Sequence, residues 1–518
     1  MRNSFRLILV IISSILLILS YPDFNFKFLA WVAFIPLFFA IDNCPSGMAF
    51  KLSYCAGLLF FLGTIYWLWH VTLLGVSLLI LYIALYFAFF GLLANRIFTI
   101  KNRNAGYETL FILPAAWVAL ELIRSYLFTG FGWVLLGHSQ AFNLRAIQIA
   151  DITGAYGVSF IVMMVNVALF ILIRSIRKKE IDFTPLAIAI FITFLVITYG
   201  QYRLNNIFTG ERMRVAIVQG NVSQDKKWDP SFKEEILKRY ESLTKAVSSE
   251  KCDLIIWPET SVPAVLPAEK TVLERIKSLV LSVKTPLLIG NIREDEELRY
   301  VYYNSATLFL DDGRIQATYD KVHLVPFGEY IPMKFLLSFV EKIAPAPIGD
   351  VMKGREYTVF SFFVERVTKA KDASWKFMKK VKFSALVCFE DIFPSISRRF
   401  VQDGALFLVN ITNDAWYKKT SAAYQHAQNS VFRAVENRVN VVRATNTGYS
   451  CFIDQKGAIL ADVSDDSGER LFISGFKSFD IVLTKTNTFY TQYGDIFAYL
   501  CLIASILYFA VFRRKEAF

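Results

Sequence analysis

The chain has 518 residues, of which 55% are hydrophobic and 16% aromatic. This composition is too apolar for an ordinary soluble protein of one or two domains, and it indicates insertion into a membrane. The formal charge of +12 does not require a nucleic-acid partner, because polytopic membrane proteins retain Lys and Arg in their cytoplasmic loops.

Eight apolar segments approach the length of about 20 residues that crosses a hydrocarbon core as a helix. The second and seventh are the shortest. No small-residue cleavage site follows the first, which is therefore expected to be a membrane helix rather than a signal peptide. The segments lie near residues 5–21, 27–42, 51–70, 73–94, 108–126, 157–173, 185–200 and 492–512.

Basic residues between these segments predict the orientation of the chain, since Lys and Arg concentrate on the cytoplasmic side. They follow the fourth, sixth and eighth segments and also lie at the start of the chain. We therefore expect a bundle of seven helices over 1–200, an extracytoplasmic domain over 201–491, and a C-terminal helix with a cytoplasmic tail over 492–518. The basic residues are Arg2, Arg6, Arg96, Lys101, Arg103, Arg174, Arg177, Lys178, Lys179, Arg513, Arg514 and Lys515.

Beyond residue 212 the long apolar blocks give way to short strand-like runs separated by helical patterns. Because the runs are continuously apolar rather than alternating, they predict sheets that are covered on both faces. The fold expected here is α/β. The strand-like runs are MRVAIVQG, DLIIWPE, PLLIG, ATLFL, FSALVCF, ALFLVN and VNVVRAT, and the helical patterns cover 231–248, 269–283 and 422–438.

The run SALVCFED places Cys388 at the end of an apolar strand and directly before acidic residues. A cysteine in such a run is most often a small core residue, but the carboxyl edge of a sheet is also where α/β proteins place their sites. A thiol there needs a nearby base or cation to become a nucleophile. The four histidines are widely spaced, so neither a metal site nor a cofactor is expected.

Two other strand ends offer the missing charges. DLIIWPETS places Glu259 after an apolar strand, and YDKVHLVPFGEYIP places Lys321 and Glu329 around another. Each is ambiguous alone: a single Glu often sits at a helix N-terminus, and a single Lys usually lies on the surface.

Taken together, Glu259, Lys321 and Cys388 with their motifs WPE, YDKVHLVPFGE and CFE resemble the catalytic triad of the nitrilase superfamily. A domain of that kind held between seven helices and one resembles the apolipoprotein N-acyltransferase family. Further segments carry this resemblance across nearly the whole chain: VQGNVSQDKKWDP, FGW, NDAWY and QHAQNSVFRAVENRVNVVRATNTGYS. The resemblance implies a polytopic membrane protein whose outer domain is a nitrilase-like αββα sandwich.

The resemblance also implies the chemistry. Cys388 would be the nucleophile, Glu259 the general base and Lys321 the stabiliser of the oxyanion. The acyl donor would be a phospholipid such as phosphatidylethanolamine, and the acceptor a diacylated apolipoprotein, in the bacterial inner membrane with the catalytic domain on the periplasmic side.

The same resemblance gives supporting roles to further residues. Glu329 and Glu390 would orient Lys321 and the intermediate, and Phe389 would add a backbone N–H to the oxyanion hole. Trp228 and Trp416 would contact substrate. The family often has Tyr in place of Phe389, so a hydroxyl is missing at that position.

Two rival functions remain from the residues alone. The first is a membrane-tethered amidase or nitrilase, for which one anchor would suffice. The second is a transporter or receptor with an outer sensing domain, against which the intact triad argues.

Two segments fit the predicted sheets poorly. Residues 331–350 are interpreted as a covering loop or a lid on the membrane. Residues 365–382 are interpreted as a solvated basic face or a site of attraction to anionic headgroups.

Overall fold

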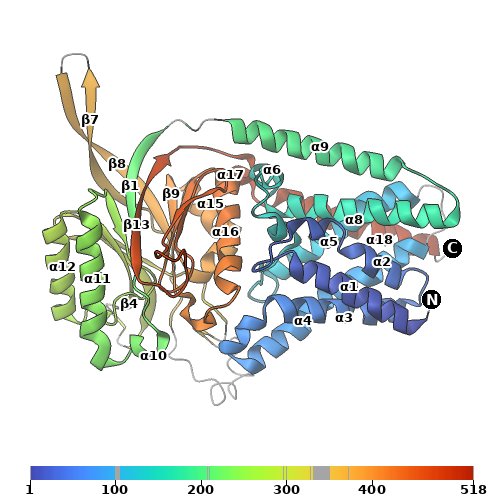
Figure 1. The fold of residues 1–518 in the computed structure, drawn as a ribbon, viewed down its shortest axis with the longest axis horizontal. Coiled ribbons are helices and arrows are strands. Elements are labelled where there is room, and N and C mark those ends of the chain that lie inside the picture. Colours follow the sequence, from blue (N-terminus) through green and yellow to red (C-terminus); the bar gives the residue numbers. More distant parts are fainter. Residues whose placement is uncertain are drawn as a thin grey trace. The chain divides into compact units, whose positions relative to one another are not determined.

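The computed structural model describes residues 2–99, 105–206, 208, 210–295, 297–298, 300–326, 328–330, 351–370 and 373–516. It divides into two compact units. The helical unit comprises Met1–Ile207 and Thr488–Phe518, and the sheet unit comprises Phe208–Asn487. The helical unit is thus built from both ends of the chain (Figure 1).

Five described helices of the helical unit are long and apolar enough to cross a membrane: α3, α4, α5, α8 and α9. Three shorter apolar helices cover Asn3–Leu19, Lys27–Ile41 and Ile496–Val511. All eight overlap predicted segments. The α-helices of this unit are α1 (Asn3–Leu19), α2 (Phe34–Ile41), α3 (Ser46–Thr64), α4 (Leu73–Thr99), α5 (Ala105–Tyr126), α6 (Leu144–Ile147), α7 (Ala150–Thr153), α8 (Ala155–Lys178), α9 (Thr184–Asn205), α17 (Phe489–Tyr493) and α18 (Ile496–Glu516).

The third predicted segment, 51–70, differs in its bounds. Helix α3 begins at Ser46 and ends at Thr64, and a separate 3-10 helix, η2, covers Tyr66–His70. The sequence YWLWH is apolar enough to extend a helical pattern, yet the side chain of Trp67 turns back to donate to the carbonyl of Thr64 at 3.1 Å. Hydropathy alone could not locate this break.

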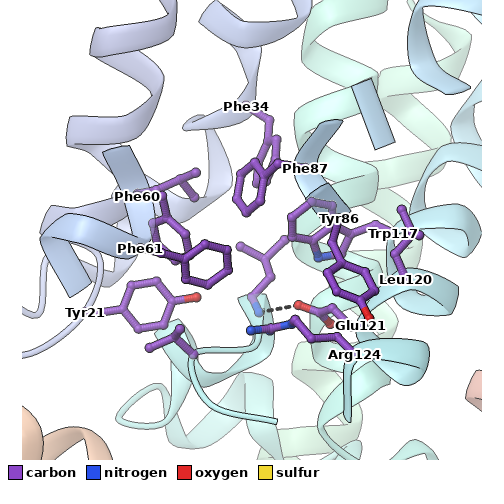
Figure 2. Close-up of a pocket in the computed structure, with 13 residues that line it drawn as sticks. Tyr21, Phe34, Phe60, Phe61, Tyr86, Phe87, Trp117, Leu120, Glu121 and Arg124 are labelled. Atoms are coloured by element: carbon purple, nitrogen blue, oxygen red, sulfur yellow. Dashed lines mark hydrogen bonds between the residues drawn. The ribbon is translucent and has the colours of Figure 1, made fainter. Parts of the chain in front are cut away.

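An aromatic pocket lies inside the helical unit (Figure 2). Glu121 and Arg124 lie on one side of it, and each binds a backbone group. The carboxylate of Glu121 accepts from the N–H of Leu136 at 2.6 Å, and Arg124 donates to the carbonyl of Trp133 at 2.9 Å. Because polar side chains in an apolar bundle need partners, these contacts hold residues 133–136 against α5.

The first sheet of the sheet unit has the order β13-β1-β2-β4-β5-β6, with β3 paired to β4. Strands β1, β2 and β4 are parallel, whereas the β13-β1, β4-β5 and β5-β6 pairs are antiparallel. Its strands are β1 (Glu211–Gln219), β2 (Leu254–Ile256), β3 (Val265–Leu266), β4 (Leu287–Glu294), β5 (Tyr302–Phe309), β6 (Ile315–Asp320) and β13 (Gly475–Leu483).

The second sheet has the order β12-β11-β10-β9-β8-β7. Its central strands β8, β9 and β10 are parallel, so their carboxyl ends meet at one edge. Its strands are β7 (Phe360–Ala370), β8 (Ala373–Val387), β9 (Phe407–Thr412), β10 (Asn440–Thr445), β11 (Cys451–Ile453) and β12 (Ile459–Asp462).

Helices cover the outer faces of the two sheets. Helices α11 (Lys233–Ser248) and α12 (Lys270–Val283) pack their apolar faces on β1, β2 and β4, while α15 (Pro394–Gln402) and α16 (Ala422–Asn437) lie against β8 and β10 (Figure 1). The inner faces meet where β1 lies against β10 and β5 against β8. Strands β2, β9 and β10 are buried along their whole length, as continuous apolar runs predict. The expected αββα sandwich is confirmed.

The basic stretch 365–382 lies in a hairpin formed by β7 and β8, apart from residues 371–372, which are outside the described part (Figure 1). Arg366 binds Glu211 at 2.6 Å and Asp253 at 3.1 Å, and Lys379 also binds Glu211. Neither predicted interpretation anticipated these contacts, which tie part of the basic stretch to β1. The proposed lid at 331–350 lies outside the described residues.

Candidate active site

Cys388 follows the last residue of β8 and begins the short 3-10 helix η5 (Cys388–Ile392). Its φ of +54° lies in the left-handed region, which costs a non-glycine residue about 1 to 2 kcal/mol. The strand delivers the thiol to the sheet edge, and the turn then redirects the chain. Such local strain is typical of positions where geometry serves a site.

The thiol of Cys388 is buried, with 7% of the residue exposed. Burial, together with the nearby carboxylate of Glu259, raises its pKa well above the usual range, and Lys321 lowers it in part. The resting thiol is therefore protonated, so its use as a nucleophile requires a base that removes the proton.

Glu259 lies in the loop that leaves β2, and Gly290 of β4 allows this loop to approach closely. A Cβ on Gly290 would lie 2.5 Å from the carbonyl oxygen of Pro258 and 2.6 Å from the Cα of Glu259. The side chain of Asn304 donates to the carboxylate of Glu259 at 2.7 Å. Glu259 is thus buried with its carboxylate held by a neutral donor.

Lys321 directly follows β6 and is 1% exposed. Its Nζ donates to Glu329 at 2.9 Å and lies 3.9 Å from Oε1 of Glu259. Burial lowers its pKa, but Glu329, Glu259 and Cys388 outweigh this effect and raise it above the ordinary value. Lys321 is therefore a fixed cation. The structure brings Glu259, Lys321 and Glu329 together, with Cys388 within their electrostatic reach.

Glu390 is fully buried and accepts four hydrogen bonds. The donors are Tyr319 O–H at 2.8 Å and the backbone N–H groups of Val322 at 2.7 Å, His323 at 3.1 Å and Val387 at 2.7 Å. Burial raises its pKa to about 7, and these donors and Lys321 oppose the rise. Glu390 thereby joins the loop after Lys321 to the turn that carries Cys388.

The remaining predicted residues surround this centre less directly. Phe389 is buried in η5 directly after Cys388. Trp228 and Trp416 are half-buried, at the end of α10 (Gln224–Lys227) and within η6 (Asp414–Tyr417). Asn413 and Gln224 join these two short helices by a hydrogen bond of 2.9 Å.

Three polar residues at the site were not among the sequence predictions. Asn304 lies in a buried strand and donates to Glu259 and Glu329. Lys227 is buried and donates to the carbonyl of Glu259 at 3.1 Å. His426 lies in α16 and contacts the carbonyl of Cys388 at 3.3 Å. An Asn inside a strand and a His on a helix face were the available signals, but neither specifies a partner.

The arrangement supplies what acyl transfer through a covalent intermediate needs. A protonated thiol lies within electrostatic reach of a buried carboxylate, and a fixed cation lies beside that carboxylate where negative charge can develop.

Comparisons with known proteins place the chain in a family. Residues 13–168 match the family model described as the apolipoprotein N-acyltransferase N-terminal domain, and residues 214–475 match that of carbon-nitrogen hydrolases. The chain is also similar to a crystal structure of Nit3 from Saccharomyces cerevisiae at 19% identity and a TM-score of 0.38, covering 54% of this chain and 92% of that chain.

Two curated relatives extend over nearly the full length. An apolipoprotein N-acyltransferase of Geobacter metallireducens is 39% identical, covering 98% of this chain and 96% of that protein. One of Chlorobaculum tepidum is 30% identical, covering 98% and 97%. The chain belongs to the apolipoprotein N-acyltransferase family.

Proposed function

We propose that this protein transfers the sn-1 acyl chain of a phospholipid to the α-amino group of the diacylglyceryl-cysteine at the N-terminus of apolipoproteins. Phosphatidylethanolamine is the expected donor. The proposal is carried by one observation: a buried cysteine within electrostatic reach of a buried carboxylate and a fixed lysine, in a chain that also has a bundle of apolar helices.

In the first half-reaction Glu259 accepts the proton of the Cys388 thiol, and the sulfur attacks the ester carbonyl of the phospholipid. Lys321 and the backbone N–H of Phe389 stabilise the oxyanion, and donors of this kind typically contribute about 3 kcal/mol each. When the tetrahedral intermediate collapses, the lysophospholipid alkoxide leaves with a proton from Glu259. A thioester remains on Cys388.

In the second half-reaction the free α-amine of the acceptor attacks the thioester. Glu259 accepts a proton from the attacking amine and returns one to the departing sulfur, which leaves an amide on the lipoprotein and restores the thiol. The scheme is ping-pong. Glu329 and Glu390 orient Lys321 and the turn at Cys388, while Trp228 and Trp416 contact substrate.

Water competes with the amine for the thioester, so the site must exclude it. We place the helical unit in the bacterial inner membrane and the sheet unit on the periplasmic side. The basic residues at the start of α1 and at the end of α8 support this orientation.

The test incubates the purified full chain in lipid nanodiscs with phospholipids fluorescently labelled at sn-1 or sn-2, and then adds a diacylated lipopeptide. We expect a hydroxylamine-labile label on the wild type from the sn-1 lipid, and its transfer to the peptide as a stable amide. Cys388→Ala should form no adduct. Cys252→Ala is the matched control, because Cys252 is a buried core cysteine of the same unit.

Three outcomes would contradict the proposal. Acyl transfer by Cys388→Ala would remove the thioester from the mechanism. Hydrolysis of small amides without loading from lipid would favour the amidase alternative. The absence of any adduct on the wild type would favour a transporter or receptor.

A further inference from the structure

A buried polar cluster contacts the backbone of Cys388. His426 of α16 places Nε2 at 3.0 Å from Oδ1 of Asp391 and Nδ1 at 3.0 Å from Oδ1 of Asp414. All three residues are at most 2% exposed. A neutral imidazole has one N–H and would therefore direct a lone pair at one of these carboxylates. With both carboxylates ionised, the geometry requires a proton on both ring nitrogens.

The charges of the cluster balance only with that second proton. Arg443 of β10 contacts Asp391 at 2.9 Å and lies 3.8 Å from Asp414, so two carboxylates face one guanidinium and one imidazole. Burial lowers the pKa of His426, but Asp391 and Asp414 outweigh both burial and the repulsion from Arg443, and the pKa rises to about 9. The imidazolium is thus the second cation of a buried neutral quartet.

The cluster contacts the backbone carbonyl of Cys388. The carbonyl oxygen of Cys388 lies 3.3 Å from Nε2 of His426 and accepts from Nδ2 of Asn410 at 3.0 Å. This carbonyl and the N–H of Phe389 belong to one planar trans peptide, in which they point in opposite directions. Fixing the carbonyl therefore fixes the direction of the Phe389 N–H.

We propose that His426 is a positioning residue that acts through the carbonyl of Cys388 to aim the Phe389 N–H at the oxyanion. This inference rests on the proposed function, because that function gives the Phe389 N–H its role. Asn410, which lies in β9, donates to the same carbonyl and is a second positioning residue.

The test compares two reactions of the same sulfur. Alkylation of Cys388 by iodoacetamide develops no oxyanion, whereas acyl loading from an ester does. His426→Gln keeps a side chain of similar size and one amide donor but removes the charge. Glu436→Gln is the control, since Glu436 lies on the same helix in a buried ion pair with Arg433.

We expect His426→Gln to lower kcat for acyl loading by about 10-fold to 100-fold, as slight misplacement of a reacting group does. KM for the donor and the rate of alkylation should stay within about twofold of wild type, because neither depends on the oxyanion. Glu436→Gln should leave the ratio of loading to alkylation unchanged. A parallel fall of both rates in His426→Gln, or no change in either, would overturn the proposal.

The comparison is made with a fluorescent phospholipid and with a p-nitrophenyl ester. If the wild type loads from the ester but not from the phospholipid, the proposed function fails, while the role of His426 can still be read from the ester.

A second measurement addresses the protonation state directly. The chain has four histidines, so ¹⁵N NMR of the histidine-labelled protein in nanodiscs can be assigned with His426→Gln. At pH 7.5, where an unperturbed histidine is mainly neutral, we expect both ring nitrogens of His426 to carry protons. A single protonated nitrogen at that pH would overturn the proposed role of His426.

Discussion

Lys227 provides a second buried ammonium group near Cys388, in surroundings unlike those of Lys321. Lys321 has the carboxylate of Glu329 at 2.9 Å, whereas Lys227 donates to a backbone carbonyl, that of Glu259. Burial lowers the pKa of Lys227 to about 8, although Glu259 and Cys388 oppose the change. A charge held in this way costs folding energy, which suggests that it is retained for the site.

We therefore predict that Lys227→Met stabilises the folded protein and slows acyl loading of Cys388. Burial lowers the pKa of this ammonium group, so holding it charged at pH 7 costs folding free energy. Replacing it by an apolar side chain removes that cost, and the melting temperature at pH 7 should rise. Acyl loading should fall, because a cation near the thiolate is lost. Thermal unfolding and single-turnover loading of the full chain in nanodiscs measure both effects.

The pH dependence of stability supplies the control for this variant. An unfolded lysine keeps its proton to about pH 10.5, but the folded Lys227 loses it near 8, so the wild type gains stability as pH rises between these values. Lys227→Met should lack that gain. Parallel melting curves of the two proteins across this range would show that Lys227 is not buried as a charge.

Asn304 shows why single residues of the site escape sequence analysis. Glu259, Lys321 and Cys388 lie within motifs, so their roles could be predicted. Asn304, the third residue of β5, joins Glu259 to Glu329, which lie 70 positions apart in sequence. Its function depends on how β5 aligns with β4 and β6, and no local pattern specifies that register.

Among the secondary-structure elements, the contact between β4 and the loop after β2 has a direct effect on the site. Glycine at position 290 allows the backbone of residues 258–260 to lie against the strand, and Thr260 itself has a φ of +44°. The position of the proposed base thus depends on a missing Cβ.

Gly290→Ala should displace Glu259 and lower acyl loading by about 10-fold to 100-fold. Alkylation of Cys388 should fall as well, because removal of the thiol proton needs the same base. The rates of acyl loading and of alkylation by iodoacetamide, measured as for the His426 variant, test this prediction. Gly47→Ala is the control, since nothing lies within 4 Å of a Cβ built there. Normal rates in Gly290→Ala would mean that the loop yields without moving Glu259.

Part of the sheet unit was predictable because its apolar runs are continuous and its helical patterns amphipathic. The predicted elements are β1, β2, β4, β5, β8, β9, β10, α11, α12 and α16, whereas the short strands β3, β11 and β12 and the partly exposed strands β6 and β13 were not predicted. The β7–β8 hairpin was not, since the 365–382 stretch contains many lysines and reads as a surface segment. Strand pairing and the ion pairs of Arg366 with Glu211 and Asp253 override that local preference.

For the whole molecule, buried ionisable groups set the pH range of stability. The pKa of His426 is raised from 6.5 to about 9, so the folded state binds more protons than the unfolded state between these values. Stability from this group is complete below pH 6.5 and is lost as pH rises through 9. The pKa of Glu390 is raised from 4.5 to about 7, so this group also makes the folded state less stable as pH rises between these two values.

We predict that the wild type loses thermal stability from pH 6.5 to 8, below the range in which Lys227 acts in the opposite direction, and that His426→Gln flattens this decline. Melting temperatures of the full chain in nanodiscs, taken at half-unit intervals of pH, measure the slope. Glu436→Gln should keep the wild-type slope. An equally steep decline in His426→Gln would assign the pH dependence to other groups.

The helical unit takes its last helix from the far end of the chain. Helix α18 packs on α5, and Tyr126 donates to Asp495 at 2.5 Å. During synthesis, residues 208–487 leave the ribosome before α18 does, so the sheet unit can begin folding while α5 still lacks its contact with α18. Biogenesis therefore ends with a docking step inside the membrane, and mutations at Tyr126 or Asp495 would delay assembly without touching the catalytic residues.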